Sequence, residues 1–210
     1  MQIRASSWRY AEDFIPESEA ITAAATRGQH LGAAPVGQGT GAALRGFAAA
    51  ARATAVVEIG TGAGASGLWL LSGMPGRGVL TTVDVSAELQ SAAREAYAAA
   101  DIPSYRLRVI CGNALTVLPR FADRAYDLVF VDADAVDYPR YVEQGLRLLR
   151  PGGVLAINRM LGADTVADPV ARDETTTILR DLGKSLRDDH DLVVTLLPVG
   201  DGLLTAVTPQ

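Results

Sequence analysis

The chain has 210 residues, of which 49% are hydrophobic and 20% charged, enough for one well-buried α/β domain and too few for two of ordinary size. Its formal net charge is −5 and it has no Lys/Arg-rich run, which argues against nucleic-acid binding because no stretch could neutralise a line of phosphates. We therefore expect a single domain whose partners are small molecules.

The cysteine content and the apolar runs predict the compartment. Cys111 is the only cysteine, so no intrachain disulfide can form, as is usual in a reducing cytoplasm. No apolar run reaches the roughly 18 residues that a membrane helix needs, and the N-terminus lacks the apolar core of a signal peptide. We expect a cytoplasmic protein that binds no membrane.

The first 53 residues are expected to form a helical extension of the same domain. Residues 1–15 show no clear periodicity and are interpreted as a loose arm. Ala-rich helices are predicted at about 16–26 and 42–52, separated by a Gly- and Pro-containing loop at 28–41. Because small Ala-rich faces pack closely, we expect these helices to form a lid over the site or a dimer surface.

From residue 54 onward, strand and helix patterns alternate, which predicts a doubly wound, mostly parallel sheet as the cofactor-binding core (54–210). The two last strands are joined by the hairpin-type turn Gly200-Asp201-Gly202, so the last of seven strands is expected to be antiparallel. The expected strands are 55–60, 78–84, 105–111, 126–132, 153–158, 191–197 and 202–208, and the expected helices are 65–73, 86–100, 113–121, 138–149 and 170–187.

A glycine-rich turn after the first strand of this core predicts a ligand site. The strand runs directly into Gly60, Gly62 and Gly64, and a helix is expected from Ala65. Glycines remove Cβ atoms where the backbone turns sharply and a ligand comes close, and the first N–H groups of the helix are free to face that ligand. We therefore interpret the turn as a cofactor site rather than as a simple connection between a strand and a helix.

Two classes of cofactor fit such a turn. It satisfies the dinucleotide fingerprint G-x-G-x-x-G, with Asp84 about 20 residues further on. However, the carboxylate of Glu58, two residues before the first glycine, would repel a pyrophosphate and attract a sulfonium and an ammonium group. The pattern E-x-G-x-G-x-G is arranged as in S-adenosylmethionine-dependent methyltransferases, and we expect that cofactor. An NAD(P)-dependent reductase is the alternative, although a Tyr-x-x-x-Lys-type pair is missing.

Polar residues stand at the ends of three predicted strands. Asp84, Asp132 and Asn158 should converge on one crevice with the glycine turn, because ligands in such sheets bind at the carboxyl ends of the strands. Asp84 is expected to accept hydrogen bonds from the ribose hydroxyls. Its other possible role, capping the next helix, suits Ser86 better.

Three carboxylates follow the fourth expected strand, in the run from Asp132 to Asp137, and such a cluster invites a hard divalent cation. With the blocks 58–71, 126–134 and 148–153 and the closing Gly-Asp-Gly turn, the sequence resembles the bacterial O-methyltransferases related to catechol and caffeoyl-CoA O-methyltransferases. The resemblance implies a Rossmann-like class I methyltransferase fold, S-adenosylmethionine as cofactor and a homodimer.

The resemblance also implies roles for individual residues. The glycine turn and the start of its helix would hold the methionine part of the cofactor above Glu58, Asp84 and Val85 would hold the ribose and the adenine edge, and Val36 would close over the cofactor. Asp132 would touch both the cofactor and the acceptor. The implied cofactor-binding residues are Val36, Glu58, Gly60, Thr61, Gly62, Ser66, Asp84, Val85, Ala114 and Asp132.

Two departures from the family pattern change the expected chemistry. Ala135 stands where the family has a lysine that acts as general base, and Asn158-Arg159 stands where Asp-Asn completes a divalent metal site. A guanidinium at that position opposes a dication and can pair with Asp132 instead. We therefore predict no catalytic metal ion.

The chain is accordingly expected to be an S-adenosylmethionine-dependent O-methyltransferase for a small hydroxylated, catechol-like acceptor. In this hypothesis Asp132 and Arg159 are catalytic, Asp132 and Asn158 contact the acceptor, and Arg159 partly replaces the metal by stabilising a developing oxyanion. The alternative is a plain ion pair between Arg159 and Asp132, in a protein that binds the cofactor with little or no turnover.

Overall fold

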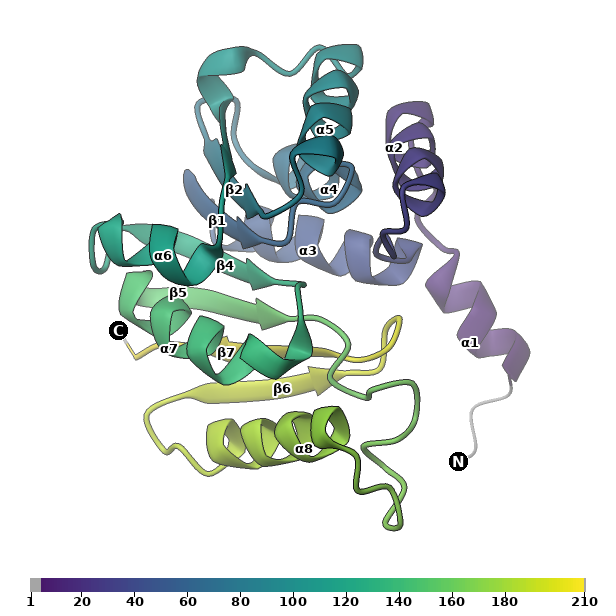
Figure 1. The fold of residues 1–210 in the computed structure, drawn as a ribbon, viewed down its shortest axis with the longest axis vertical. Coiled ribbons are helices and arrows are strands. Elements are labelled where there is room, and N and C mark those ends of the chain that lie inside the picture. Colours follow the sequence, from purple (N-terminus) through teal and green to yellow (C-terminus); the bar gives the residue numbers. More distant parts are fainter. Residues whose placement is uncertain (1–4, 210) are drawn as a thin grey trace.

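The seven strands form one sheet in the order β3-β2-β1-β4-β5-β7-β6 (Figure 1). The computed structural model describes residues 5–209. The strands are β1 Ala55–Ile59, β2 Val79–Asp84, β3 Leu107–Cys111, β4 Tyr126–Val131, β5 Leu149–Ile157, β6 Val193–Leu197 and β7 Leu203–Val207.

Strands β1 to β5 pair in parallel, and β7 runs antiparallel between β5 and β6. This confirms the expected doubly wound sheet with an antiparallel last strand. The chain winds outward from β1 through β2 to β3 and then crosses back to β4 on the other side of β1. The carboxyl ends of β1 and β4 therefore border the crevice at which such sheets bind ligands.

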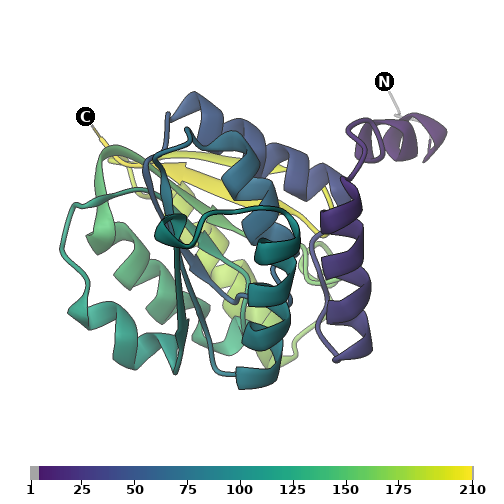
Figure 2. The same ribbon diagram turned by 90° about the horizontal axis from the view of Figure 1, so that it is seen from above.

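Helices cover both faces of the sheet (Figure 2). Successive strand residues alternate between the two layers: Val56 and Phe130 belong to the core under α3, α4 and α5, whereas Val57 and Val129 belong to the core under α7 and α8. The helices are α1 Ala5–Glu12, α2 Glu19–His30, α3 Gln38–Ala50, α4 Ala65–Gly73, α5 Ala87–Ala99, α6 Ala114–Val117, α7 Tyr138–Leu148 and α8 Glu174–Arg187, with short 3₁₀ turns η1 Ser104–Arg106, η2 Leu118–Arg120 and η3 Ala135–Asp137.

The N-terminal extension differs from the sequence-based prediction. Residues 5–12 form helix α1, so the interpretation of this stretch as a loose arm is wrong, while residues 1–4 lie outside the described part. Helix α3 begins at Gln38, inside the predicted loop, because its glycines serve helix packing: a Cβ on Gly41 would collide with the Trp69 indole of α4. Helix α2 lies against α4 and α5.

Two helix boundaries in the core also differ, each for a local reason. Helix α6 ends at Val117 and continues only as η2, in which Pro119 occupies one of the first positions. Helix α8 begins at Glu174, four residues later than predicted, because the Asp173 carboxylate accepts the Thr176 N–H as an N-cap (2.9 Å).

Among the helices of residues 5–209, none combines the length and apolar character needed to cross a membrane.

Candidate active site

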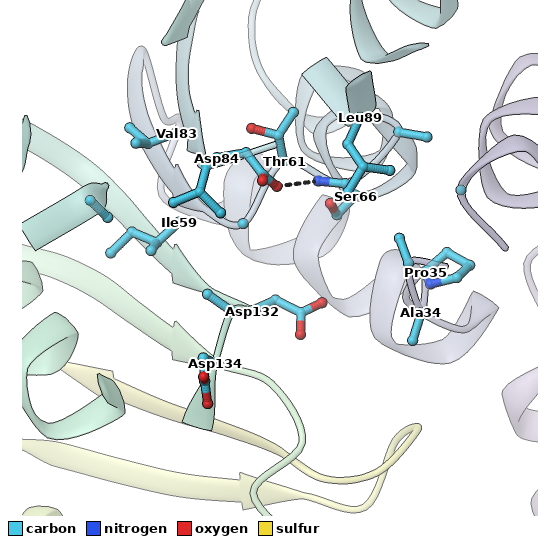
Figure 3. Close-up of a pocket in the computed structure, with 18 of the residues that line it drawn as sticks. Ala34, Pro35, Ile59, Thr61, Ser66, Val83, Asp84, Leu89, Asp132 and Asp134 are labelled. Atoms are coloured by element: carbon cyan, nitrogen blue, oxygen red, sulfur yellow. Dashed lines mark hydrogen bonds between the residues drawn. The ribbon is translucent and has the colours of Figure 1, made fainter. Parts of the chain in front are cut away.

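A pocket of about 430 Å³ opens at the carboxyl ends of β1, β2 and β4, where the sheet order reverses (Figure 3). Its wall brings together most of the residues singled out from the sequence, which come from the segment before α3, the glycine turn and the ends of four strands. Those that line it are Val36, Gly60, Thr61, Gly62, Ser66, Asp84, Val85, Ala114, Asp132 and Arg159. Glu58 and Asn158 are buried and do not line it.

Glu58 lies one layer behind the pocket wall. Its Oε1 accepts a hydrogen bond from Ser66 Oγ (2.6 Å) and its Oε2 accepts one from Thr82 Oγ1 (2.7 Å). Burial raises the pKa of Glu58 to about 7, although both hydroxyls favour the charged form. This position agrees with the expected place of Glu58 beneath the methionine part, and Ser66, which lines the pocket, lies between the carboxylate and the pocket space. The charge of Glu58 therefore acts on a ligand in the pocket across Ser66, through buried protein of low dielectric constant.

Each glycine of the turn is needed for a different physical reason. At Gly60 (φ 97°) a Cβ would collide with the backbone oxygen of Asp132, so that glycine permits the close approach of two strand ends. At Gly64 (φ 93°) a Cβ would press on Tyr97 and Ala93. At Gly62 (φ 51°), a Cβ would meet no atom of the described structure within 4 Å. Of these three glycines, only Gly62 leaves space beside its backbone that a ligand could enter.

Asp84 ties the glycine turn to the end of β2. Its Oδ2 accepts the Gly62 N–H (3.0 Å, dashed in Figure 3) and its Oδ1 accepts the Ser86 N–H (2.9 Å). Ser86 caps α5 through its own hydroxyl, which accepts the Leu89 N–H (3.2 Å), so Asp84 is not the cap. Each carboxylate oxygen has a further lone pair available for a ligand in the pocket.

At the other end of the pocket, Asp132 pairs with Arg159. The Asp132 side chain is only 7% exposed, and the Arg159 Nε lies 3.1 Å from its Oδ1. This contact is an ion pair without a well-directed hydrogen bond, since Oδ1 has no hydrogen-bond donor in the described structure. Burial raises the pKa of Asp132, while the Arg159 guanidinium and the Asn158 amide oppose the rise. Arg159 also donates from Nη2 to the carbonyl oxygen of Ala34 (2.8 Å).

The side chains at this end do not fit a divalent metal ion. A hard dication needs several oxygen ligands, and here one carboxylate (Asp132) and one amide (Asn158) stand beside a fixed positive charge. Asp134 accepts the Val136 N–H (3.1 Å) and Asp137 pairs with Arg140 (3.2 Å). Across residues 5–209 there is no group of three or more His, Cys, Asp or Glu side chains suited to a metal.

Sequence reasoning missed Gln90, which braces the cofactor end of the pocket. Its buried Nε2 donates to the Ile110 carbonyl oxygen (2.6 Å) and to Thr61 Oγ1 (3.3 Å), and Thr61 Oγ1 also shares a hydrogen bond with Thr82 Oγ1 (2.6 Å). A signal was present: Gln90 stands three and seven residues before the buried Ala93 and Tyr97, on the inner face of α5. A polar residue at that spacing needs buried partners.

Known proteins resemble this chain in sequence and in fold. A family model described as O-methyltransferase matches residues 17–208. A probable O-methyltransferase of Mycobacterium tuberculosis (strain ATCC 25618 / H37Rv) is 46% identical over 202 residues, which are 96% of this chain and 90% of the relative. The structure of the O-methyltransferase TomG of Streptomyces achromogenes, involved in tomaymycin synthesis and bound to S-adenosylmethionine, has a TM-score of 0.87 at 26% identity over 100% of both chains. An O-methyltransferase of Bacillus cereus in complex with S-adenosylhomocysteine has a TM-score of 0.85 at 26% identity over 97% of both chains.

Proposed function

The chain belongs to the O-methyltransferase family, whose members use S-adenosylmethionine, and on that premise we propose that it methylates a hydroxyl group of a small, catechol-like acceptor without a divalent metal ion. The observation that carries the metal-free part is the guanidinium of Arg159, which lies 3.1 Å from the one carboxylate, Asp132, that a metal would need.

The cofactor end of the pocket has the chemistry that S-adenosylmethionine requires. Asp84 offers carboxylate lone pairs for the ribose hydroxyls, Val85 and Ala114 line the wall beside it, and Gly62 leaves room for close backbone approach. Ser66 presents its hydroxyl to the methionine part while donating its proton to Glu58. When bound, the cofactor supplies an electrophilic methyl group.

At the acceptor end, we assign the acid–base role to Asp132 and the electrostatic role to Arg159. The Asp132 carboxylate lines the pocket and can take the proton of an acceptor hydroxyl. The Arg159 guanidinium then stabilises the oxyanion that attacks the methyl group, and the Asn158 amide orients Asp132. Methyl transfer is an in-line displacement, so correct positioning of the two reactants supplies much of the acceleration.

A second candidate is a protein that binds the cofactor with little turnover. The ion pair between Asp132 and Arg159 favours it, because a carboxylate held by a guanidinium is a weaker base, and Ala135 supplies no other base. In both cases we propose a cytoplasmic homodimer, which agrees with the single cysteine and with the exposed aromatic side chains of α1.

Calorimetric titration and a methyl-transfer assay test the proposal. We expect S-adenosylhomocysteine to bind equally well with Mg²⁺ and with chelator, and labelled methyl groups to reach one or more members of a panel of catechols under both conditions. Asp132→Asn keeps an amide oxygen that can still accept from Arg159, so it should keep the binding and lose at least about 100-fold in transfer rate, as expected for removal of a general base. A strict Mg²⁺ requirement would contradict the metal-free mechanism, and binding without transfer to any acceptor would favour the second candidate.

A further inference from the structure

Arg159 has an unusual backbone conformation directly after β5. Its φ is 58°, a backbone angle that residues other than glycine, asparagine and aspartate rarely adopt. The next two residues are fastened to the closing hairpin, since Met160 N–H donates to the Gly202 oxygen (3.0 Å) and Leu161 N–H to the Asp201 oxygen (2.9 Å). The Gly-Asp-Gly turn therefore fixes the point from which the Arg159 side chain extends.

The guanidinium joins two segments that are far apart in the sequence. One contact is to Asp132 at the end of β4, and the other is to the carbonyl oxygen of Ala34, in the connection between α2 and α3. Residues 33–36 of that connection line the cofactor pocket. Figure 3 shows the Asp132 carboxylate extending toward the side of the pocket on which Ala34 and Pro35 lie.

Little else fastens this connection to the rest of the molecule. Ala33 N–H donates to the Gly28 oxygen at the end of α2 (2.9 Å), and Val36 is buried against the core. In the described structure, the only hydrogen bond to the backbone of residues 34–36 comes from the Arg159 side chain. A single side chain thus supplies the polar attachment of this part of the pocket wall, residues 34–36.

We propose that Arg159 is a positioning residue for the cofactor: it holds residues 34–36 closed over the pocket by bridging Ala34 to Asp132. The inference rests on the proposed function, because it takes the pocket to be the S-adenosylmethionine site. Charge alone would give the opposite effect, since a guanidinium repels the positively charged cofactor. For S-adenosylmethionine, removal of the guanidinium should therefore tighten binding by charge. S-adenosylhomocysteine lacks the sulfonium, so with this ligand the charge effect is small and loss of the bridge should be measured as faster dissociation.

Arg159→Gly and Arg159→Asn test the proposal, because both residues accept a positive φ and neither side chain reaches Ala34. With chelator present, we expect S-adenosylhomocysteine to dissociate about tenfold faster from both variants, as for the loss of one charge-assisted hydrogen bond. In the ligand-free proteins, elastase should cut faster within residues 33–36. Arg140→Ala is the matched control, because it removes a cation that pairs with the pocket residue Asp137 without touching this connection; its dissociation and cleavage rates should equal those of the wild type.

Unchanged or slower dissociation in both variants, or unchanged cleavage at residues 33–36, would overturn the bridge. An effect in the glycine variant alone would overturn it as well, since chain flexibility would then be the cause. Failure of the wild-type protein to bind S-adenosylhomocysteine would instead contradict the proposed function, and the ligand-free cleavage arm would still decide whether Arg159 holds the connection.

Discussion

Glu58 is buried and has no cationic partner among residues 5–209, and this has a measurable effect on stability. Because the pKa of Glu58 is raised from 4.5 to about 7, the folded protein binds this proton more tightly than the unfolded chain does. Below pH 4.5, the ionisation of Glu58 therefore does not change the free energy of unfolding. As the pH rises through 7 it lowers this free energy, by about 3 kcal/mol well above pH 7. We predict that Glu58→Gln is more stable than the wild type at about pH 8.5 and nearly equal at about pH 5, measured by urea unfolding. A loss of stability at both pH values would contradict the prediction.

The same substitution tests the electrostatic preference for a positively charged cofactor. S-adenosylmethionine carries a sulfonium charge that S-adenosylhomocysteine lacks, and only the former gains from a carboxylate behind Ser66. Glu58→Gln should therefore weaken binding of the methylated form more than binding of the demethylated form. Calorimetry with both ligands at about pH 8, where Glu58 is ionised, measures the difference. An equal change for both ligands would show that the charge is not sensed.

At the residue scale, the place of Glu58 could be predicted from the sequence, but its hydrogen-bond partners could not. The alternation of strand β1 puts Glu58 on the same face as Val56, toward α4, and not at the strand tip. The period of two was visible in the sequence and predicts a buried acid, without indicating which hydroxyls it would contact. The bridge from Arg159 to Ala34 could not be foreseen, because it spans 125 residues and depends on the path of a loop.

At the scale of elements, α3 and α4 meet through small residues. A Cβ at Gly41 would collide with the buried Trp69 ring, whereas Gly46 on the same helix faces open space. We predict that Gly41→Ala destabilises the protein by about 1–3 kcal/mol through overpacking. Gly46→Ala is the matched control and should stabilise it by about 0.5–1 kcal/mol, because glycine is a poor helix former. Chemical denaturation of both variants measures this, and a stable Gly41→Ala protein would mean that the helices can separate at little cost.

The same contact explains why helix α3 was predicted too short. Glycine in the sequence Gln38-Gly39-Thr40-Gly41 indicates a loop when only local preference is considered. In the folded protein, tertiary contacts use these glycines instead: Gly41 admits Trp69, and Gly39 lies against the Glu12 carboxylate, which accepts its N–H (3.1 Å). Strands β1 and β4 were predicted closely because their apolar residues are continuous and buried on both faces.

At the scale of the whole molecule, the doubly wound, mostly parallel sheet followed from the alternation of strands and helices, since parallel connections are right-handed and return to the same sheet. That alternation also places Asp84 and Asp132 at one edge, as the pocket wall shows. How α1 lies against the rest could not be predicted, because the helix has no buried residue that would give its sequence an apolar stripe. Its end is attached by polar contacts, among them the hydrogen bonds that the Glu12 carboxylate accepts from the Gly39 and Gly200 N–H groups.

Helix α1 points away from the sheet in both views (Figures 1 and 2), and aromatic side chains on it and just after it are uncovered. Tyr10 is 70% exposed and Phe14 is 63% exposed. Exposed apolar side chains that lie close together are characteristic of surfaces that bind another protein, and the proposed occupant is α1 of a second copy of the chain. We therefore predict that the wild type sediments as a dimer at micromolar concentration and that Tyr10→Ser/Phe14→Ser sediments as a monomer. Val193→Ser, which alters an equally exposed apolar residue on edge strand β6, should leave the dimer intact. A monomeric wild type would contradict the proposed assembly, and a dimer that only Val193→Ser disrupts would move the interface to the sheet edge.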